Sequence, residues 1–137
     1  MNRKIVLLLI AGIIVALAAL GYYFYNKPTA SVIGMKSDFI KTASELYSEF
    51  EANEQEATQK YQNKVIEVTG VIDSIAQNEN GGKMVILNTG GGMGSINLDL
   101  DTSVVHKQTL EKGKEVTMKG ICSGYLLDVV LNRSVVK

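Results

Sequence analysis

Two valine-rich stretches share one pattern, and this repetition constrains the fold more than any other feature of the sequence. Apolar side chains recur at every second position in Lys64–Ile75 and again in Lys114–Cys122, which is typical of strands with one buried face. The matching positions are Ile66, Val68 and Gly70 in the first stretch and Val116, Met118 and Gly120 in the second. Glycine packs nothing inside a strand, so two at matching places predict bends or close backbone approaches in one closed sheet. The alternative is a chance resemblance between two valine-rich strands.

The uncharged apolar run Ile5–Phe24 is about as long as the ~20 residues that cross a bilayer as a helix. Arg3 and Lys4 precede it and aromatic residues cluster over 22–25, as at a membrane interface. We therefore expect a signal anchor over residues 1–26, with 5–25 in the membrane, the N-terminus in the cytoplasm and the remainder outside. The alternative is a cleaved signal peptide, because A-L-A at 16–18 has the small-x-small form of a cleavage site.

The chain after the apolar run divides into a linker and one domain. Residues 27–36 contain the only proline and a glycine, which interrupt a helix and predict a short linker. Residues 37–137 have the length of a single domain. Within it we expect helices over 37–62 and a barrel over 63–137.

Helical spacing of apolar residues predicts an amphipathic helix from Asp38 to Ala52, with Asp38 or Ser37 as its N-cap. Its apolar stripe consists of Phe39, Ala43, Leu46, Tyr47 and Phe50. Asn53 followed by Glu56 fits a capping box, so a second helix is expected after a bend at Asn53. We expect the first helix to cover an open end or side of the barrel, rather than to offer an acidic face to a partner.

Turn-forming residues divide the barrel region into strands. Gln77–Gly82 predicts a hairpin turn. Thr89–Gly94 predicts a flexible hairpin tip, because it lacks the lysine and the following helix of a phosphate-binding loop. The other expected elements are strands Lys83–Asn88, Ser95–Leu100 and Leu126–Val136, a short helix Val104–Leu110, and a Ser123-Gly124 turn before the last strand. The expected barrel interior is Ile66, Val68, Ile72, Leu87, Leu98, Val116, Leu127, Val129 and Leu131.

A three-strand meander, a short helical connection and a final hairpin form the element order of the OB-fold, a five-stranded Greek-key barrel. In that fold the first and fourth strands lie side by side, which would place Gly70 and Gly120 at neighbouring bends. The expected fold class is therefore α+β, with an N-terminal transmembrane helix, then helices and an OB-fold barrel.

Several segments also resemble one known family. They are A-N-E at 52–54, K-Y-Q-N-K-V-I-E-V-T-G at 60–70, K-G-I-C-S-G-Y at 119–125 and D-V-V-L-N at 128–132. Together they resemble the tRNA_anti-like family of bacterial OB-fold lipoproteins and membrane-anchored proteins, over about residues 37–136. The resemblance implies a location at the bacterial inner membrane, with the C-terminal domain in the periplasm, and no established catalytic residues. The chain departs from the lipoproteins because it has no cysteine just after the apolar run; Cys122 is the only cysteine.

The composition of the domain argues against nucleic acid as its ligand. OB domains that hold single strands combine a basic groove with exposed aromatic side chains on which bases stack. No Phe, Tyr or Trp lies between Tyr61 and Tyr125. Without Arg3 and Lys4, twelve basic residues face fourteen acidic ones, a net charge of −2, which does not attract phosphate.

The sequence also lacks the pattern of an enzyme or of a cofactor site. His106, the only histidine, falls on the expected short helix without an acid or a nucleophile at recognisable spacing. Cys122 alternates inward with Met118, so we expect a buried, inert thiol. Asp99 and Asp101 lack the later glycine and glutamate of a calcium loop. We therefore expect no catalytic residue, metal or cofactor.

The resulting hypothesis is a membrane-anchored, extracytoplasmic OB-fold module that binds or assembles with an envelope protein or a glycan. Its candidate ligand-binding residues lie on or beside the second and third barrel strands, and they are Lys83, Asn88, Ser95 and Asn97. A merely solvated face is the alternative at these positions. Two other functions stay open, a nucleic-acid-binding OB domain and an envelope-stress protein that binds a small molecule or cation.

Overall fold

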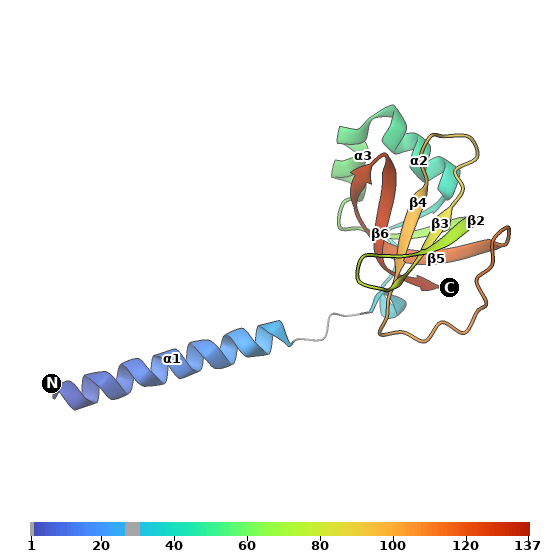
Figure 1. The fold of residues 1–137 in the computed structure, drawn as a ribbon. Coiled ribbons are helices and arrows are strands. Elements are labelled where there is room, and N and C mark those ends of the chain that lie inside the picture. Colours follow the sequence, from blue (N-terminus) through green and yellow to red (C-terminus); the bar gives the residue numbers. More distant parts are fainter. Residues whose placement is uncertain (1, 27–30) are drawn as a thin grey trace. The chain divides into compact units, whose positions relative to one another are not determined.

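The computed structural model describes residues 2–26 and 31–137, and the chain forms two compact units, Met1–Ala30 and Ser31–Lys137. The first contains α1 (Arg3–Tyr25), an apolar helix without buried residues. Its length and mean hydropathy of 2.8 suffice to cross a membrane. The second contains the strands and the helices α2 and α3, as Figure 1 shows.

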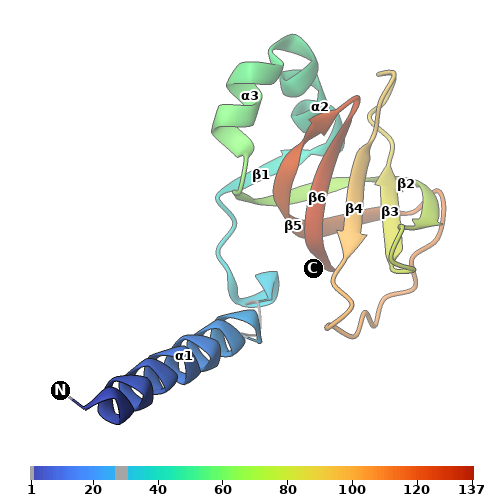
Figure 2. The same cartoon turned by 60° about the vertical axis from the view of Figure 1, so that its left-hand side comes forward.

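Five strands of the second unit close into a barrel. They are β2 (Val65–Gln77), β3 (Lys83–Leu87), β4 (Ile96–Leu100), β5 (Glu115–Leu126) and β6 (Asp128–Val136). Around the barrel their order is β2-β3-β4-β6-β5, and β5 pairs back onto β2 (Figure 2). Only β4 and β6 run parallel among these neighbours. This is the order of the OB-fold, so the predicted α+β fold is confirmed.

The helix predicted from Asp38 begins later than expected. The segment Phe39–Thr42 is a strand, β1, which pairs in parallel with β2. Helix α2 (Ala43–Ala52) follows, and Thr42 and Glu45 form a complete capping box at its start. The prediction of helix over 37–62 is therefore wrong at its beginning, because pairing with β2 outweighs the helical spacing of Phe39.

Helices α2 and α3 (Glu54–Tyr61) cover one end of the barrel, in the upper part of Figures 1 and 2. Asn53 caps α3 through a bond from the Glu56 backbone N–H, as predicted. Phe50 is 1% exposed and its ring stacks on that of Tyr125 at a centroid distance of 5.3 Å. The helices therefore belong to the same hydrophobic core as the barrel strands.

The predicted barrel interior is buried except at Leu127, which is 70% exposed. The prediction of a turn at Ser123-Gly124 is also wrong. Strand β5 continues through both residues to Leu126, with a bulge between Cys122 and Gly124. The chain reverses at Leu127, which has a φ of 70°. The bulge leaves Ser123 as the extra, unpaired residue while Gly124 pairs with Val130, so the strand continues and the hairpin turn falls at Leu127.

The repeated glycines serve two separate close approaches. Strands β2 and β5 lie side by side, as predicted, but their antiparallel register pairs Gly70 with Val116 and Gly120 with Ile66. The two glycines are therefore not neighbours. A Cβ at Gly70 would lie 2.8 Å from that of Ala43, whereas a Cβ at Gly120 would overlap the Ser134 hydroxyl.

The connection between β4 and β5 is irregular rather than helical, so the prediction of a helix at Val104–Leu110 is wrong. Asp101 binds the backbone N–H and the hydroxyl of Ser103, and His106 Nε2 lies 3.0 Å from the Asp101 carbonyl oxygen. These local bonds give the backbone an alternative to helical hydrogen bonding.

The predicted linker 27–36 extends into the domain. Residues 27–30 lie outside the described residues, but a short helix, η1 (Val32–Gly34), begins soon after. Val32 is fully buried in a small cluster with Val65 and Val135. The domain therefore begins before residue 37.

Candidate binding surface

The outer face of the barrel carries a polar cluster formed by Ser95, Asn97 and Asp128. Asp128 Oδ1 accepts hydrogen bonds from the Ser95 backbone N–H at 2.7 Å and lies 2.9 Å from the Ser95 hydroxyl. Asp128 Oδ2 accepts a bond of 3.3 Å from the Asn97 side-chain amide. All three residues are half-buried. We call them the polar cluster.

Sequence alternation correctly placed Ser95 and Asn97 on one face, but it missed Asp128. The parallel pairing of β4 with β6 brings Asp128 next to them, with Asn97 opposite Val130. The half-buried apolar side chain of Ile86 lies opposite Asn97 on the other side. No local signal in the sequence indicates this parallel pairing.

In the part of the chain that the structure describes, Lys83 and Asn88 make no hydrogen bond to the polar cluster; Lys83 begins β3 and Asn88 directly follows its end. Asn88 accepts a bond from the Gly90 backbone N–H at 2.6 Å and lines a hollow of about 450 Å³ beside the start of α2. Lys83 lines a different hollow of about 390 Å³, together with Ile75 and His106. The structure thus divides the four predicted residues among three places.

The face around the polar cluster is acidic and has no aromatic side chains. Strands β3 and β4 contain no aromatic residue, and Asp99 lies on the same face as Asn97 because the two are two positions apart on β4. The ring of Phe50 instead packs against those of Tyr61 and Tyr125, in the core that α2 and α3 share with the barrel. The arrangement therefore offers hydrogen bonds but no stacking platform for bases.

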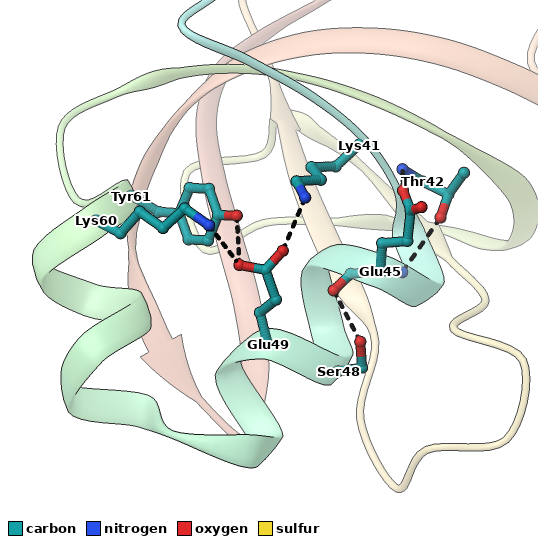
Figure 3. A network of polar contacts seen from close by, with 7 residues as sticks. All are labelled: Lys41, Thr42, Glu45, Ser48, Glu49, Lys60 and Tyr61. Carbon is teal, nitrogen blue, oxygen red and sulfur yellow. Dashed lines mark hydrogen bonds and ion pairs between the residues drawn. The ribbon is translucent and has the colours of Figure 1, made fainter.

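A second polar network joins β1, α2 and α3, as Figure 3 shows. The Glu49 carboxylate binds Lys41 and Lys60 at 2.8 Å each and accepts a 2.6 Å bond from the Tyr61 hydroxyl. These contacts, led by Lys41, lower the pKa of Glu49 from 4.5 to about 2. These charged and polar groups satisfy one another's hydrogen bonding and charge. We therefore infer that the network stabilises the packing of the helices on the barrel.

The two residues considered for catalysis have different surroundings. Cys122 is fully buried, and burial raises the pKa of its thiol to about 11, which disfavours the nucleophilic thiolate at neutral pH. The His106 ring contacts the Asp101 backbone. Within the described residues, no group of three or more His, Cys, Asp or Glu side chains is placed to hold a metal ion.

A closed five-stranded barrel with this strand order, a filled interior and helices over one end defines an OB-fold domain. The family model for tRNA_anti-like proteins matches residues 1–136. The chain therefore belongs to the tRNA_anti-like family.

One solved structure with the same fold is the crystal structure of a "putative nucleic acid-binding lipoprotein" from Klebsiella pneumoniae subsp. pneumoniae. It is 20% identical, with a TM-score of 0.55, and the match covers 72% of this chain and 92% of that one. At this identity the likeness shows the fold alone. No curated protein matches the chain.

Proposed function

We propose that this protein is a membrane-anchored binding module of the bacterial envelope, with its OB-fold domain outside the cytoplasm and no catalysis of its own. The polar cluster is the observation that supports this most. It forms a half-buried polar surface on a barrel whose interior side chains are buried. A barrel of this size, once filled, leaves only its outer face and its loops for a ligand.

Helix α1 supports the anchored location. Its apolar residues are exposed in the chain and would be covered by lipid. Arg3 and Lys4 at its start favour a cytoplasmic N-terminus, and the aromatic residues at its end fit the opposite membrane interface. Retention of α1 in the mature protein is part of the proposal; cleavage would instead release a secreted domain.

The chemistry of the polar cluster suits a protein or glycan ligand. Asn97 and Asp128 keep acceptor lone pairs beyond the bonds they make within the cluster. These acceptors can bind backbone N–H groups or sugar hydroxyls. The neighbouring Ile86 adds apolar contact area at the same place.

Nucleic acid is the second candidate, favoured by the description of the Klebsiella protein. The carboxylates of Asp99 and Asp128 on this face disfavour phosphate. We expect no gel shift of single-stranded DNA or RNA at physiological salt. A shift that weakens steeply with salt would favour the nucleic-acid function instead.

Cross-linking in native membranes, followed by purification of the chain, tests the proposed surface. We expect a Ser95→Ala/Asn97→Ala double variant to lose an envelope partner that the wild type retains. Lys83→Ala is the matched control, because Lys83 lines a separate hollow at the start of β3. Recovery of the same partners with the double variant, at unchanged melting temperature, would place the binding surface elsewhere.

A further inference from the structure

Two neighbouring loops at the helix-covered end of the barrel expose large apolar side chains. Met93 is 95% exposed, Leu126 89% and Leu127 70%. Met93 belongs to the glycine-rich loop between β3 and β4, Leu126 ends β5, and Leu127 is the turn residue between β5 and β6. We call these three residues the apolar tip.

The two loops are fixed to each other. A Cβ at Gly94 would overlap the Leu127 carbonyl oxygen, so the loop backbones lie in contact. The Thr89 hydroxyl binds the Gly94 carbonyl at 2.8 Å, and the Val129 N–H binds the Ser95 carbonyl at 3.0 Å. Specific hydrogen bonds therefore hold the backbone of the loop Thr89–Gly94, which was predicted to be flexible. The apolar side chains of the two loops thus stand on a defined backbone.

Leu127 combines exposure with an unfavourable backbone conformation. Its φ of 70° lies in the left-handed region, which glycine or asparagine adopts at less cost than a bulky residue. The side chain is largely exposed, so intramolecular packing offsets little of this cost. Backbone strain that the surrounding packing does not offset is found at functional sites, which makes Leu127 a candidate for a functional contact.

The surroundings of the apolar tip are acidic. The segments that build this end contain no lysine or arginine over 42–59, 84–106 and 120–132. Glu51 and Glu54 lie near Tyr125, where they add to the effects of burial and of Tyr47 that raise the pKa of its phenol. A negative field beside exposed leucines complements a partner that is both apolar and basic.

The apolar tip lies at the opposite end of β6 from η1, the element with which the domain begins. Element η1, where the domain begins, packs on β6 near Val135, whereas the tip adjoins Asp128 at the other end of that strand. At ~3.3 Å per residue along β6, the apolar tip and η1 lie about 20 Å apart. Anionic lipid headgroups would also be repelled by the acidic surroundings.

We propose that the apolar tip docks a protein segment that carries apolar side chains beside lysine or arginine. This surface is distinct from the polar cluster and from the partner proposed for it. The leucines supply the buried contact area, and Glu51 and Glu54 select for basic residues and speed association.

Binding of two fluorescent peptides to the full chain in zwitterionic nanodiscs tests this proposal. One short peptide alternates leucine and lysine, and the other replaces each lysine by glutamate. We expect only the basic peptide to bind. The double variant Leu126→Ser/Leu127→Asn should lower the affinity for the basic peptide at least about tenfold. The double variant Glu51→Gln/Glu54→Gln should lower this affinity several-fold and make it less dependent on salt.

Val105→Ser is the matched control, because Val105 is 83% exposed on a different loop; it should bind the basic peptide like the wild type. Equal binding of both peptides, or unchanged binding by the Leu126/Leu127 variant at an unchanged or higher melting temperature, overturns the proposal. Flotation with phosphatidylglycerol vesicles that depends on Leu126 and Leu127 would assign the tip to a membrane. Self-association that depends on them would assign it to a second copy, and either result also overturns the proposal.

Discussion

Phe50→Ala tests whether the helices and the barrel form one core. Phe50 is 1% exposed and packs against two rings, Tyr125 at 5.3 Å and Tyr61 at 5.8 Å. Truncation of a buried phenylalanine costs about 3–5 kcal/mol, and loss of each ring pair is included in the upper part of that range. We therefore expect the free energy of unfolding to fall by about 4 kcal/mol.

For the unit Ser31–Lys137, each kcal/mol corresponds to roughly 4 °C, so the melting temperature should fall by about 16 °C. Circular dichroism of the full chain in nanodiscs can follow the loss of sheet signal. Phe50→Leu should fall in between, because it keeps much of the volume, and Val105→Ala at an 83% exposed position should change little. A fall of less than about 4 °C for Phe50→Ala would contradict the shared core.

Three further predictions follow from the anchor, the Glu49 network and the glycine-rich loop. The mature protein should stay in the membrane fraction with α1 attached, and N-terminal sequencing that finds a soluble form beginning near Ala19 would reject the anchor. The pKa of Glu49 falls from 4.5 to about 2 on folding, so its contribution to stability is complete above about pH 4.5 and is lost as the pH falls towards 2. Glu49→Gln should therefore make the melting temperature depend less on pH between 4.5 and 2. An unchanged dependence on pH in this range would show that other carboxylates dominate the loss of stability in acid. Gly94→Ala should lower the melting temperature because its Cβ overlaps the Leu127 carbonyl, whereas Gly34→Ala meets no atom within 4 Å and should not; equal effects would mean that the loop contact is dispensable.

The barrel could be predicted because its signals are local. Alternation in β2 and β5 and the turn residues near Gly82 reflect which side of each strand faces the core and where the chain reverses. Strand β1 could not be predicted in the same way, because its partner β2 is distant in sequence. The T-A-S-E motif at 42–45 was a readable signal for the true start of α2.

The candidate site was predictable only in part. The alternation of β4 put Ser95 and Asn97 on one face, but Lys83 and Asn88 line two separate hollows, so the four candidates do not form one compact site. Asp128 enters through the parallel pairing of β4 with β6. Such a pairing depends on the closure of the whole barrel, which no short segment encodes.

Leu127 shows why an exposed turn position can be assigned wrongly from a pattern. Counting alternate residues back from Val129 and Leu131 places Leu127 on the buried face, and the count fails because the strand has not yet begun at Leu127. A turn residue chosen for folding alone would favour glycine or asparagine at a φ of 70°. The leucine breaks both the strand pattern and the turn preference, and such departures from local consistency are expected at functional or strained sites.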